Sequence, residues 1–546
     1  MDNLIRETSK KLMLVTLLWM ILITSGANLG IDTELRLQMA HAWWTDTEEV
    51  LVAPNYKPMT RWDASLGVKG KDNKRYIPYD VGQSMIMLPG DWLGTQLGNL
   101  FPKETHSDIR RIVVNLVVSL LIFIPLNVAV VASCFWLLKL FSFSDRVAAL
   151  SSTAWLFGTT VLHYAQVHQQ NNQILLFVIL GYATALAYVL REKLYFSIAS
   201  GIVMGIALLI RSTASIHILT VLLFLLGCIA YKCKDEKIKL LRAIKFWLLG
   251  FLPLAILKCF IEYIRYGSFL ISSQKIQVEQ LLTDPIWSGL PELPDNYPFI
   301  NPPSVGIFGV LFSPEKSIFI YDPLLLPCLV LAIFLWRKLS PFIQWYLVCA
   351  IFNLALHIVL TRQLDFWHGD TAWGARYHVT SANLLLIPMV GMFMQSILCN
   401  QKFRNIFLKG ILVAAIVVQI ASVIMPFQLE VAQANVGLLE RPSIQALAVS
   451  PDSHVRFRLG QRMTNLVCLM NNEFSENCLK DFYPRATKDQ KIELETYNRI
   501  NFLPFIVGQK AVGNSRLTIV FYALILTWII LFFLTIRLTA WFILTV

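Results

Sequence analysis

Long apolar segments recur from one end of this chain to the other, and they constrain its fold more than any other feature. Most are long enough to cross a hydrocarbon layer of ~30 Å as a helix, and for two short ones a half-helix or a re-entrant segment is the alternative. A helix also satisfies its own backbone hydrogen bonds, as lipid requires. Charged residues are only 15% of the chain, against about 25% in a soluble domain. We therefore predict an all-α polytopic membrane protein.

About twelve of these segments are expected to be transmembrane helices. They are 12–31, 112–140, 147–162, 173–190, 195–210, 213–230, 244–264, 317–336, 341–360, 379–398, 406–427 and 517–546. The first follows basic residues, as a signal peptide would, but it is too long for one and lacks a small-residue cleavage site. We expect it to remain as a span.

Basic residues mark the side of the membrane on which each short connection lies. Every second connection is short and basic, and the richest holds Lys232, Lys234, Lys237, Lys239, Arg242 and Lys245. Because cytoplasmic loops are enriched in Lys and Arg, both termini are predicted to be cytoplasmic. The net charge of +12 is therefore interpreted as membrane anchoring rather than nucleic-acid binding.

Four long polar connections fall on the opposite, extracytoplasmic side. They are 32–111, 265–316, 361–378 and 428–516. The first contains an apolar stretch at 82–94, broken by Pro89 and Gly90, which favours helices lying in the interface. The last is long enough for a small folded unit. We thus expect a core over 1–427, a separate loop segment over 428–516 and a last helix over 517–546.

Two acidic residues directly follow the first apolar segment. Asp32 and Glu34 stand at a membrane exit, where a carboxylate is useful if it points into a cavity between helices. The alternative is a surface acid, or an ion pair between Asp32 and Arg36 four residues on. Asp80, in the same loop, is either a second carboxylate or a cap for the interfacial helix.

A second polar cluster lies between two predicted spans. It includes His163, His168 and Asn171, whose neutral hydrogen-bonding groups suit sugar hydroxyls or phosphate oxygens, or an ordinary hydrated loop. The two histidines do not have the ligand spacing of a known metal site. No cofactor is therefore assigned, although a divalent metal stays an alternative.

Two cations lie at the predicted extracytoplasmic boundary. Arg211 runs against the positive-inside trend, so it indicates either anion binding or a side chain that reaches the interface. Lys316 precedes a helix within a Gly- and Pro-rich segment. Helix N-terminal amides beside a lysine can hold a phosphate, but a capped helix with a solvated lysine has the same pattern.

The 361–378 loop combines aromatic and charged residues. Trp367, His368, Asp370, Arg376 and Tyr377 could form a sugar-phosphate pocket, because aromatic faces stack on sugar rings and arginine binds phosphate bidentately. An interfacial aromatic belt is the alternative, although a belt does not require so many charges. Elsewhere, Cys468 and Cys478 are candidates for a disulfide that closes a short extracytoplasmic loop.

The order of these clusters resembles the polytopic, lipid-sugar-dependent glycosyltransferases of the GT-C fold class, the superfamily of the protein O-mannosyltransferases and the lipid A aminoarabinose transferase. The resemblance is carried by Asp32–Glu34, Tyr79–Pro89, Gly309–Pro323 and Trp367–Tyr377, the last ending in Arg-Tyr as in a bacterial mannosyltransferase-like subgroup. It covers the chain from Leu12 to about Phe427. The acids here are Asp-x-Glu, where many relatives have adjacent Asp and Glu.

The resemblance implies inverting transfer of a sugar from a polyprenyl-phosphate donor. Asp32, by preference over Glu34, would accept the proton of the acceptor hydroxyl, and Arg376 with Arg211 or Lys316 would stabilise the departing lipid phosphate. A transporter or flippase of lipid-linked sugars and a ligase of envelope polymers are the alternatives. We expect a bacterial inner-membrane location, since the chain contains no Asn-x-Ser/Thr sequon.

Overall fold

The computed structural model describes residues 2–27, 30–53, 56, 58, 64–100, 107–232, 237–369, 372–399, 402–436, 458–470, 484, 486–511 and 515–546. Regular structure in these ranges is almost entirely helical, as predicted. The strands are β1 (Val68–Lys69) and β2 (Arg75–Tyr76), which pair antiparallel with Val68 opposite Tyr76. The all-α fold class is therefore confirmed.

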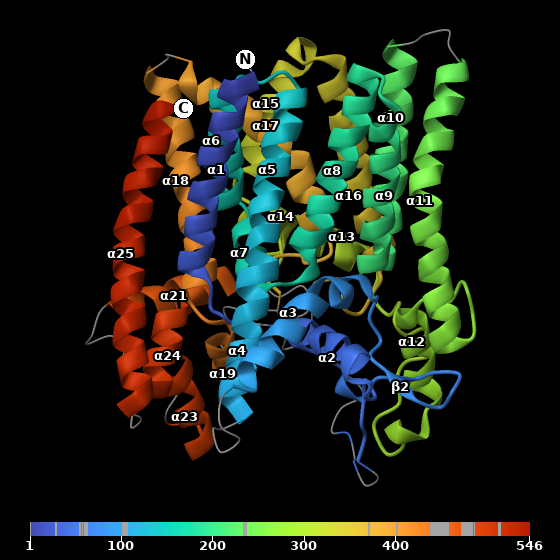
Figure 1. Cartoon of the computed structure of the whole chain (residues 1–546), viewed down its shortest axis with the longest axis vertical. Coiled ribbons are helices and arrows are strands. Elements are labelled where there is room, and N and C mark those ends of the chain that lie inside the picture. Colours follow the sequence, from blue (N-terminus) through green and yellow to red (C-terminus); the bar gives the residue numbers. More distant parts are fainter. Residues whose placement is uncertain are drawn as a thin grey trace.

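Long helices form an upright bundle (Figure 1). They are α1 (Asp2–Ile23), α4 (Ser107–Val118) continued by η2 (Ser119–Phe123) and α5 (Ile124–Leu140), α6 (Asp145–Gly158), α8 (Gln170–Arg191), α9 (Leu194–Ile210), α10 (Ser215–Lys232), α11 (Lys237–Tyr266), α15 (Leu325–Leu335), α16 (Pro341–Thr361), α17 (Val379–Leu398), α18 (Lys402–Ile424) and α25 (Ser515–Thr545).

Eight helical segments in the described ranges have the length and composition to cross a membrane. They are Arg110–Leu140, Gln170–Arg191, Ser212–Lys232, Lys237–Tyr266, Pro341–Thr361, Val379–Leu398, Asn405–Ile424 and Leu517–Thr545. Each coincides with a predicted span. The length and apolar composition of these eight helices indicate a multi-pass membrane protein.

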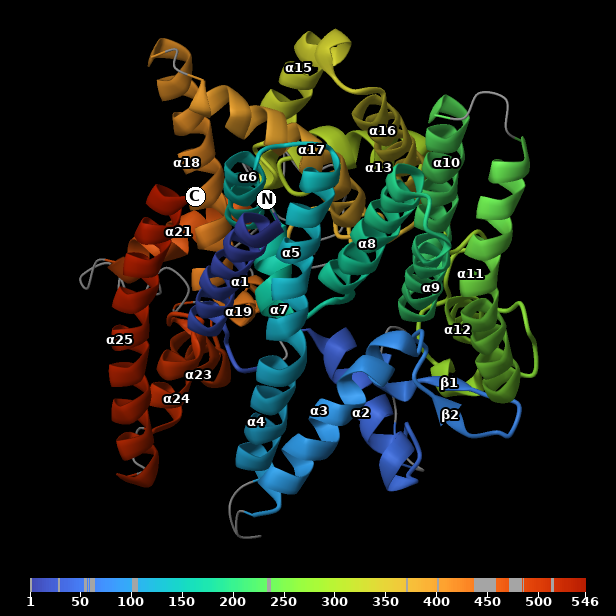
Figure 2. The ribbon, with the colours of Figure 1, turned by 45° about the horizontal axis from the view of Figure 1, so that its top comes forward.

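Shorter elements connect the long helices, and most gather at one end of the bundle. They are α2 (Ile31–Thr45), η1 (Ala64–Leu66), α3 (Gly82–Gly98), α7 (Val161–Val167), η3 (Ser212–Ala214), α12 (Ser273–Thr283), η4 (Pro285–Trp287), α13 (Pro303–Phe312), α14 (Ile318–Tyr321), η5 (Trp336–Lys338), α19 (Phe427–Asn435), α21 (Arg458–Met470), α23 (Lys488–Tyr497) and α24 (Leu503–Ala511). Figures 1 and 2 place α2 and α3 beneath the bundle and α19, α21, α23 and α24 beside α18 and α25.

The other four predicted spans are helical but differ from expectation. The first was expected over 12–31, but α1 ends at Ile23 and a separate helix, α2, begins at Ile31. Asp32 and Glu34 therefore lie in the first turn of a helix rather than in an open loop. The span expected over 195–210 is α9, a shorter apolar helix.

Two predicted spans are broken at the same point in space. Residues 147–162 divide into α6 and α7 at Thr159–Thr160, and 317–336 divides into α14 and α15 after Asp322. The backbone N–H of Thr160 donates to Asp322 Oδ1 at 2.6 Å, and its hydroxyl lies 3.0 Å from Oδ2. The carboxylate thus satisfies the backbone N–H of Thr160, the residue that precedes the first turn of α7.

Small residues allow the helices to pack closely. Gly201 of α9 faces the backbone of Trp247 in α11, and Gly250 of α11 faces the backbone of Ile198; a side-chain carbon at either glycine would collide with the other helix. Close contact of this kind replaces the hydrophobic effect as the source of packing energy in lipid.

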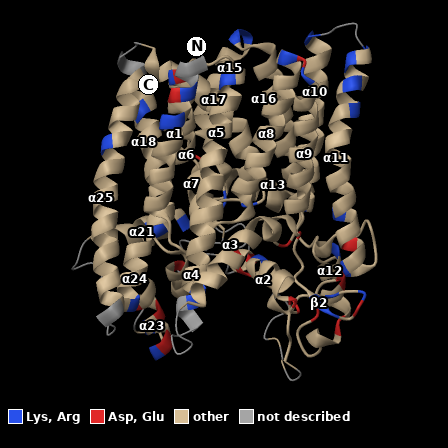
Figure 3. Cartoon of the chain, in the orientation of Figure 1, with Lys and Arg blue, Asp and Glu red and all other residues tan. Residues whose placement is uncertain are grey.

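Charged side chains concentrate at the two ends of the bundle, and its middle is nearly free of them in the described ranges (Figure 3). Both termini lie at the end opposite α2 and α3 (Figure 1). The long connections predicted to share one side of the membrane therefore meet at one end of the molecule, together with the polar clusters they contain.

Candidate functional site

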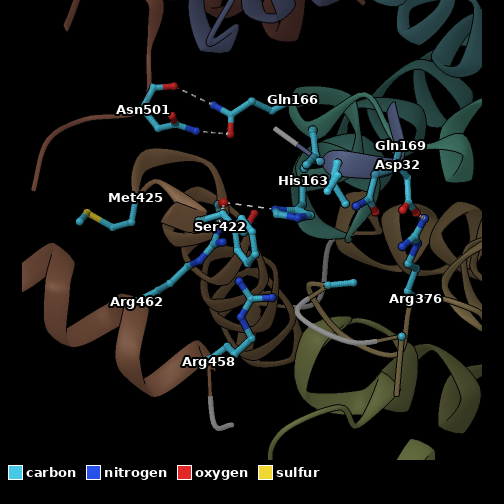
Figure 4. A pocket seen from close by; sticks show the side chains of 16 residues that line it. Asp32, His163, Gln166, Gln169, Arg376, Ser422, Met425, Arg458, Arg462 and Asn501 are labelled. Carbon is cyan, nitrogen blue, oxygen red and sulfur yellow. Dashed lines mark hydrogen bonds and ion pairs between the residues drawn. The ribbon is translucent and has the colours of Figure 1, made fainter. Parts of the chain in front are cut away.

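A cavity of about 180 Å³ opens where α2, α7 and the 361–378 loop meet the end of α18 and the first turn of α21 (Figure 4). Its lining residues come from parts of the sequence that are far apart. They are Gly30, Ile31, Asp32, His163, Gln166, Val167, Gln169, Gly369, Ala372, Arg376, Ser422, Met425, Phe427, Arg458, Arg462 and Asn501. The cavity therefore exists only in the folded chain.

Asp32 and Arg376 form an ion pair at one end of this cavity. The hydroxyl of Tyr79 donates to Oδ1 of Asp32 at 2.7 Å. Burial alone would raise the pKa of Asp32, but the charges of Arg376 and Arg36 and these two hydrogen bonds outweigh it and hold the pKa well below its usual range. Asp32 is thus a fixed carboxylate that borders an open space.

Two further guanidinium groups lie near this ion pair. Arg36 stacks over the ring of Tyr79, with 4.0 Å between its Cζ atom and the ring centroid, and Arg211 stacks over Tyr377 at 5.0 Å. Nε and Nη1 of Arg36 have no hydrogen-bond partner in the described part of the chain. Burial, with the nearby charges of Arg376 and Arg36, lowers the pKa of Arg211 to about 10. The positive charge gathered here favours an anion.

A second basic cluster lies at the opposite end of the cavity. Arg458 and Arg462 of α21 both form ion pairs with the buried carboxylate of Glu430 in α19. Arg462 also donates to the carbonyl of Ser422 and lies over the ring of Trp373, 4.7 Å from its centroid. Two guanidiniums and one carboxylate leave one excess positive charge at this end.

Neutral polar groups line the wall between the two ends (Figure 4). Nδ1 of His163 lies 3.2 Å from the carbonyl oxygen of Ser422. Burial and the charges of Arg462 and Arg458 hold its pKa well below its usual value, so the ring is uncharged. Gln166 and Asn501 hydrogen-bond to each other, which joins α7 to the segment before α24.

The structure separates the two candidate acids. Glu34 does not line the cavity and pairs with Arg111 at 2.6 Å, with about a third of its side chain exposed. Asp80 is buried between Lys258, at 2.6 Å, and the backbone N–H and hydroxyl of Ser212. Only Asp32 of these three carboxylates lines the cavity.

Several predicted binding residues support the site without lining it. Asn171 donates to the carbonyl of Arg376 at 2.8 Å. The ring of His168 stacks on Phe123, with 4.3 Å between centroids. Trp367 is fully buried, and its ring contacts that of His368. Asp370 lies outside the described residues.

Of the two alternatives for Lys316, phosphate binding or a solvated side chain, the structure excludes the solvated side chain. It is fully buried, and its ammonium donates to the carbonyl of Ala372 at 2.7 Å and lies 3.4 Å from that of Gly374. It does not line the cavity. Its role in the fold is to hold the loop from which Arg376 projects.

One of the two cysteines predicted to pair lies within the described residues. Cys468 of α21 is disulfide-bonded. Its predicted partner, Cys478, lies outside the described residues, so this pairing stays a prediction. Six other cysteines in the described ranges are free.

Sequence reasoning missed Arg458, Arg462 and Asn501. The 428–516 segment was expected to be a separate unit without an interpretable motif, yet it forms one wall of the cavity. One signal was available. Arg458 and Arg462 are four residues apart, so they share one face of a helix.

No group of His, Cys, Asp and Glu that could hold a metal ion occurs within the described ranges. Comparison of the chain with protein-family models, curated proteins and solved structures finds no match. The function is therefore inferred from the cavity and from the residues that line it.

Proposed function

We propose that the protein is a membrane glycosyltransferase of GT-C type, with about twelve spans, that transfers a sugar from a polyprenyl-phosphate donor to an acceptor hydroxyl. The observation that carries the proposal is the position of Asp32, a carboxylate that borders a cavity at one end of the helix bundle, near Arg376, Arg36 and Arg211. The reaction needs a base near a cationic group, because the acceptor oxygen loses a proton and the anomeric carbon loses a phosphate as the new bond forms between them.

In the proposed step, an Oδ atom of Asp32 accepts the proton of the acceptor hydroxyl. The acceptor oxygen forms a bond to the anomeric carbon as the bond from that carbon to the donor phosphate oxygen breaks. The electron pair leaves with the lipid phosphate, and because the acceptor attacks the opposite face of the anomeric carbon, the configuration inverts. Arg376, with Arg211 and Arg36 behind it, is placed to stabilise the added negative charge.

The ion pair between Asp32 and Arg376 gives the reaction an order. While Arg376 is paired with Asp32, the low pKa makes that carboxylate a poor base. A donor phosphate that takes over part of the Arg376 charge would raise the pKa of Asp32 and free it to accept a proton. Donor binding would therefore activate the base, and the acceptor would react only after the donor is in place.

The polar clusters and the cavity share one end of the bundle, opposite both termini. This arrangement supports a site that opens to the extracytoplasmic side of a bacterial inner membrane, with cytoplasmic termini. It favours a transferase over a flippase of lipid-linked sugars, which would need a polar path through the middle of the bundle.

The test is turnover of polyprenyl-phosphate sugars by the purified full chain in nanodiscs. Release of lipid phosphate by the wild type and its loss in Asp32→Asn, with activity kept in Glu34→Gln, is the expected result. Equal loss in both variants would remove Asp32 from its proposed role. Movement of labelled lipid-sugar across the bilayer without release of lipid phosphate would replace the transferase with a flippase.

A further inference from the structure

The cavity has a cationic end that the proposed transfer step does not use. Arg458 and Arg462 line it from α21, far in the sequence from the residues around Asp32. Both side chains are at least nine-tenths buried, with exposed fractions of 4% and 1%. Burial of a charged side chain costs free energy of folding. This cost is offset when the hydrogen-bond donors of a buried guanidinium have partners.

The two arginines differ in how many of their donors are satisfied. Arg462 directs Nε to Glu430 and Nη1 to the carbonyl of Ser422, and its plane packs on the ring of Trp373. Arg458 directs Nε to the same carboxylate. Its Nη1 atom is buried, has no hydrogen-bond partner in the described part of the chain and belongs to a residue that lines the cavity.

The charges at this end do not cancel. Glu430 is the carboxylate paired with both arginines, and His163 between the two ends is neutral. The first turn of α21 also has the positive end of its helix dipole at Arg458. A donor without a partner, an excess positive charge and an adjoining cavity together define a site for a small oxyanion.

We propose that Arg458, held in place by Glu430, binds an anionic group of the sugar acceptor, either a phosphate or a carboxylate. Asp32 and Arg376 lie together at the other end of the cavity, so the two anions would occupy opposite ends of it (Figure 4). The assignment of the ligand to the acceptor rests on the proposed transfer reaction. The existence of the anion site does not.

Inorganic phosphate is the probe for the site itself. In equilibrium dialysis of the nanodisc-embedded full chain with radiolabelled phosphate, the wild type is expected to bind two phosphates. Arg458→Gln and Arg211→Gln are each expected to weaken binding of one of the two phosphates by at least about tenfold. The double variant is expected to weaken binding of both. Arg111→Gln, a surface arginine outside the cavity, is the matched control and is expected to bind like the wild type.

Glu430→Gln separates anion binding from damage to the fold. It removes the negative charge that competes for Arg458 but keeps an amide oxygen that can accept from Arg458 Nε. Phosphate at this site is therefore expected to bind more tightly, whereas Arg458→Gln weakens it. A shift of both variants in the same direction, or phosphate binding unaffected by Arg458→Gln, would overturn the proposal.

Kinetics then assign the ligand. With a donor that turns over, Arg458→Gln is expected to raise the ratio of donor hydrolysis to transfer at least about tenfold, because water needs no anion site. An unchanged ratio with weaker donor binding would place the anion on the donor instead, as a second phosphate. If no donor turns over, the proposed function fails while the phosphate-binding result stands by itself.

Discussion

Arg376 and Asp32 form an ion pair although they are 344 positions apart in the sequence. Arg376 projects from the loop before α17, and Asp32 from the first turn of α2. Neither side chain is more than a fifth exposed. This contact fixes α2 against the bundle and also determines which of the two acids faces the cavity.

Replacing Asp32 is expected to abolish most transfer, because the amide of Asp32→Asn cannot accept the acceptor proton. A loss of about 10²–10⁴-fold in turnover is expected. Glu34→Gln is expected to retain activity within about twofold, since Glu34 pairs with Arg111 outside the cavity. Initial rates of lipid-phosphate release measure both. The reverse order of effects would identify Glu34 as the base.

Tyr79→Phe tests the hydrogen bond that holds the carboxylate. The variant removes the donor 2.7 Å from Asp32 Oδ1 and leaves the ring beneath Arg36. We expect turnover to fall about tenfold, a smaller loss than for Asp32→Asn, with donor affinity unchanged. Measurement of kcat and the donor dissociation constant separates the two effects. A Tyr79→Phe protein as inactive as Asp32→Asn would give Tyr79 a larger role.

Lys316→Met is expected to destabilise the protein by about 2 kcal/mol, because two buried carbonyl oxygens lose their donor. The change also releases the loop that carries Arg376, so turnover should fall. Thermal unfolding in detergent gives the stability. Lys275→Met, at an exposed lysine, is the control and should match the wild type. Equal stability of Lys316→Met would show that the loop is held by other contacts.

Glu315 makes stability depend on pH. Burial raises the pKa of this carboxyl to about 7 from 4.5. Between these values the folded protein holds a proton that the unfolded chain releases, so stability falls as pH rises. The loss is at most about 3 kcal/mol. Unfolding temperatures at pH 5 and pH 8 should therefore differ more in the wild type than in Glu315→Gln. Equal differences would contradict this assignment.

The disulfide of Cys468 is expected to hold α21, and with it Arg458, in place. Peptide mapping without reductant should show Cys468 linked to Cys478. Cys468→Ser should lower stability by about 2–4 kcal/mol and weaken phosphate binding. Cys399→Ser, at an exposed free cysteine, should do neither. A Cys468 linked to any other cysteine would contradict the predicted pairing.

The sequence determined the fold class and the approximate position of most long helices. Eight predicted spans coincide with apolar helices because lipid exposure requires an uninterrupted apolar surface, which a single segment displays by itself. The sequence also located the polar clusters that meet at one end of the bundle. Asp32, His163 and Arg376 were predicted site residues, and all three line the cavity.

Helix ends and the composition of the site depended on contacts that a single segment does not reveal. Asp322 ends α14 and satisfies the start of α7, so two predicted spans are broken by a contact between them. The sequence does not reveal the partners of Lys316 and Asp80. In the folded chain Lys316 donates to the carbonyl of Ala372, and Asp80 forms an ion pair with Lys258.

Only the tertiary structure brought Arg458 and Arg462 to the cavity. In the sequence they belong to a polar segment without an interpretable motif, and their role appears when Glu430 and Trp373 come within contact distance. Hydropathy is a property of a segment, so the sequence by itself determined a membrane protein with a polar end. The partner of each charge is a property of the folded chain, because a buried ion pair joins residues at any separation.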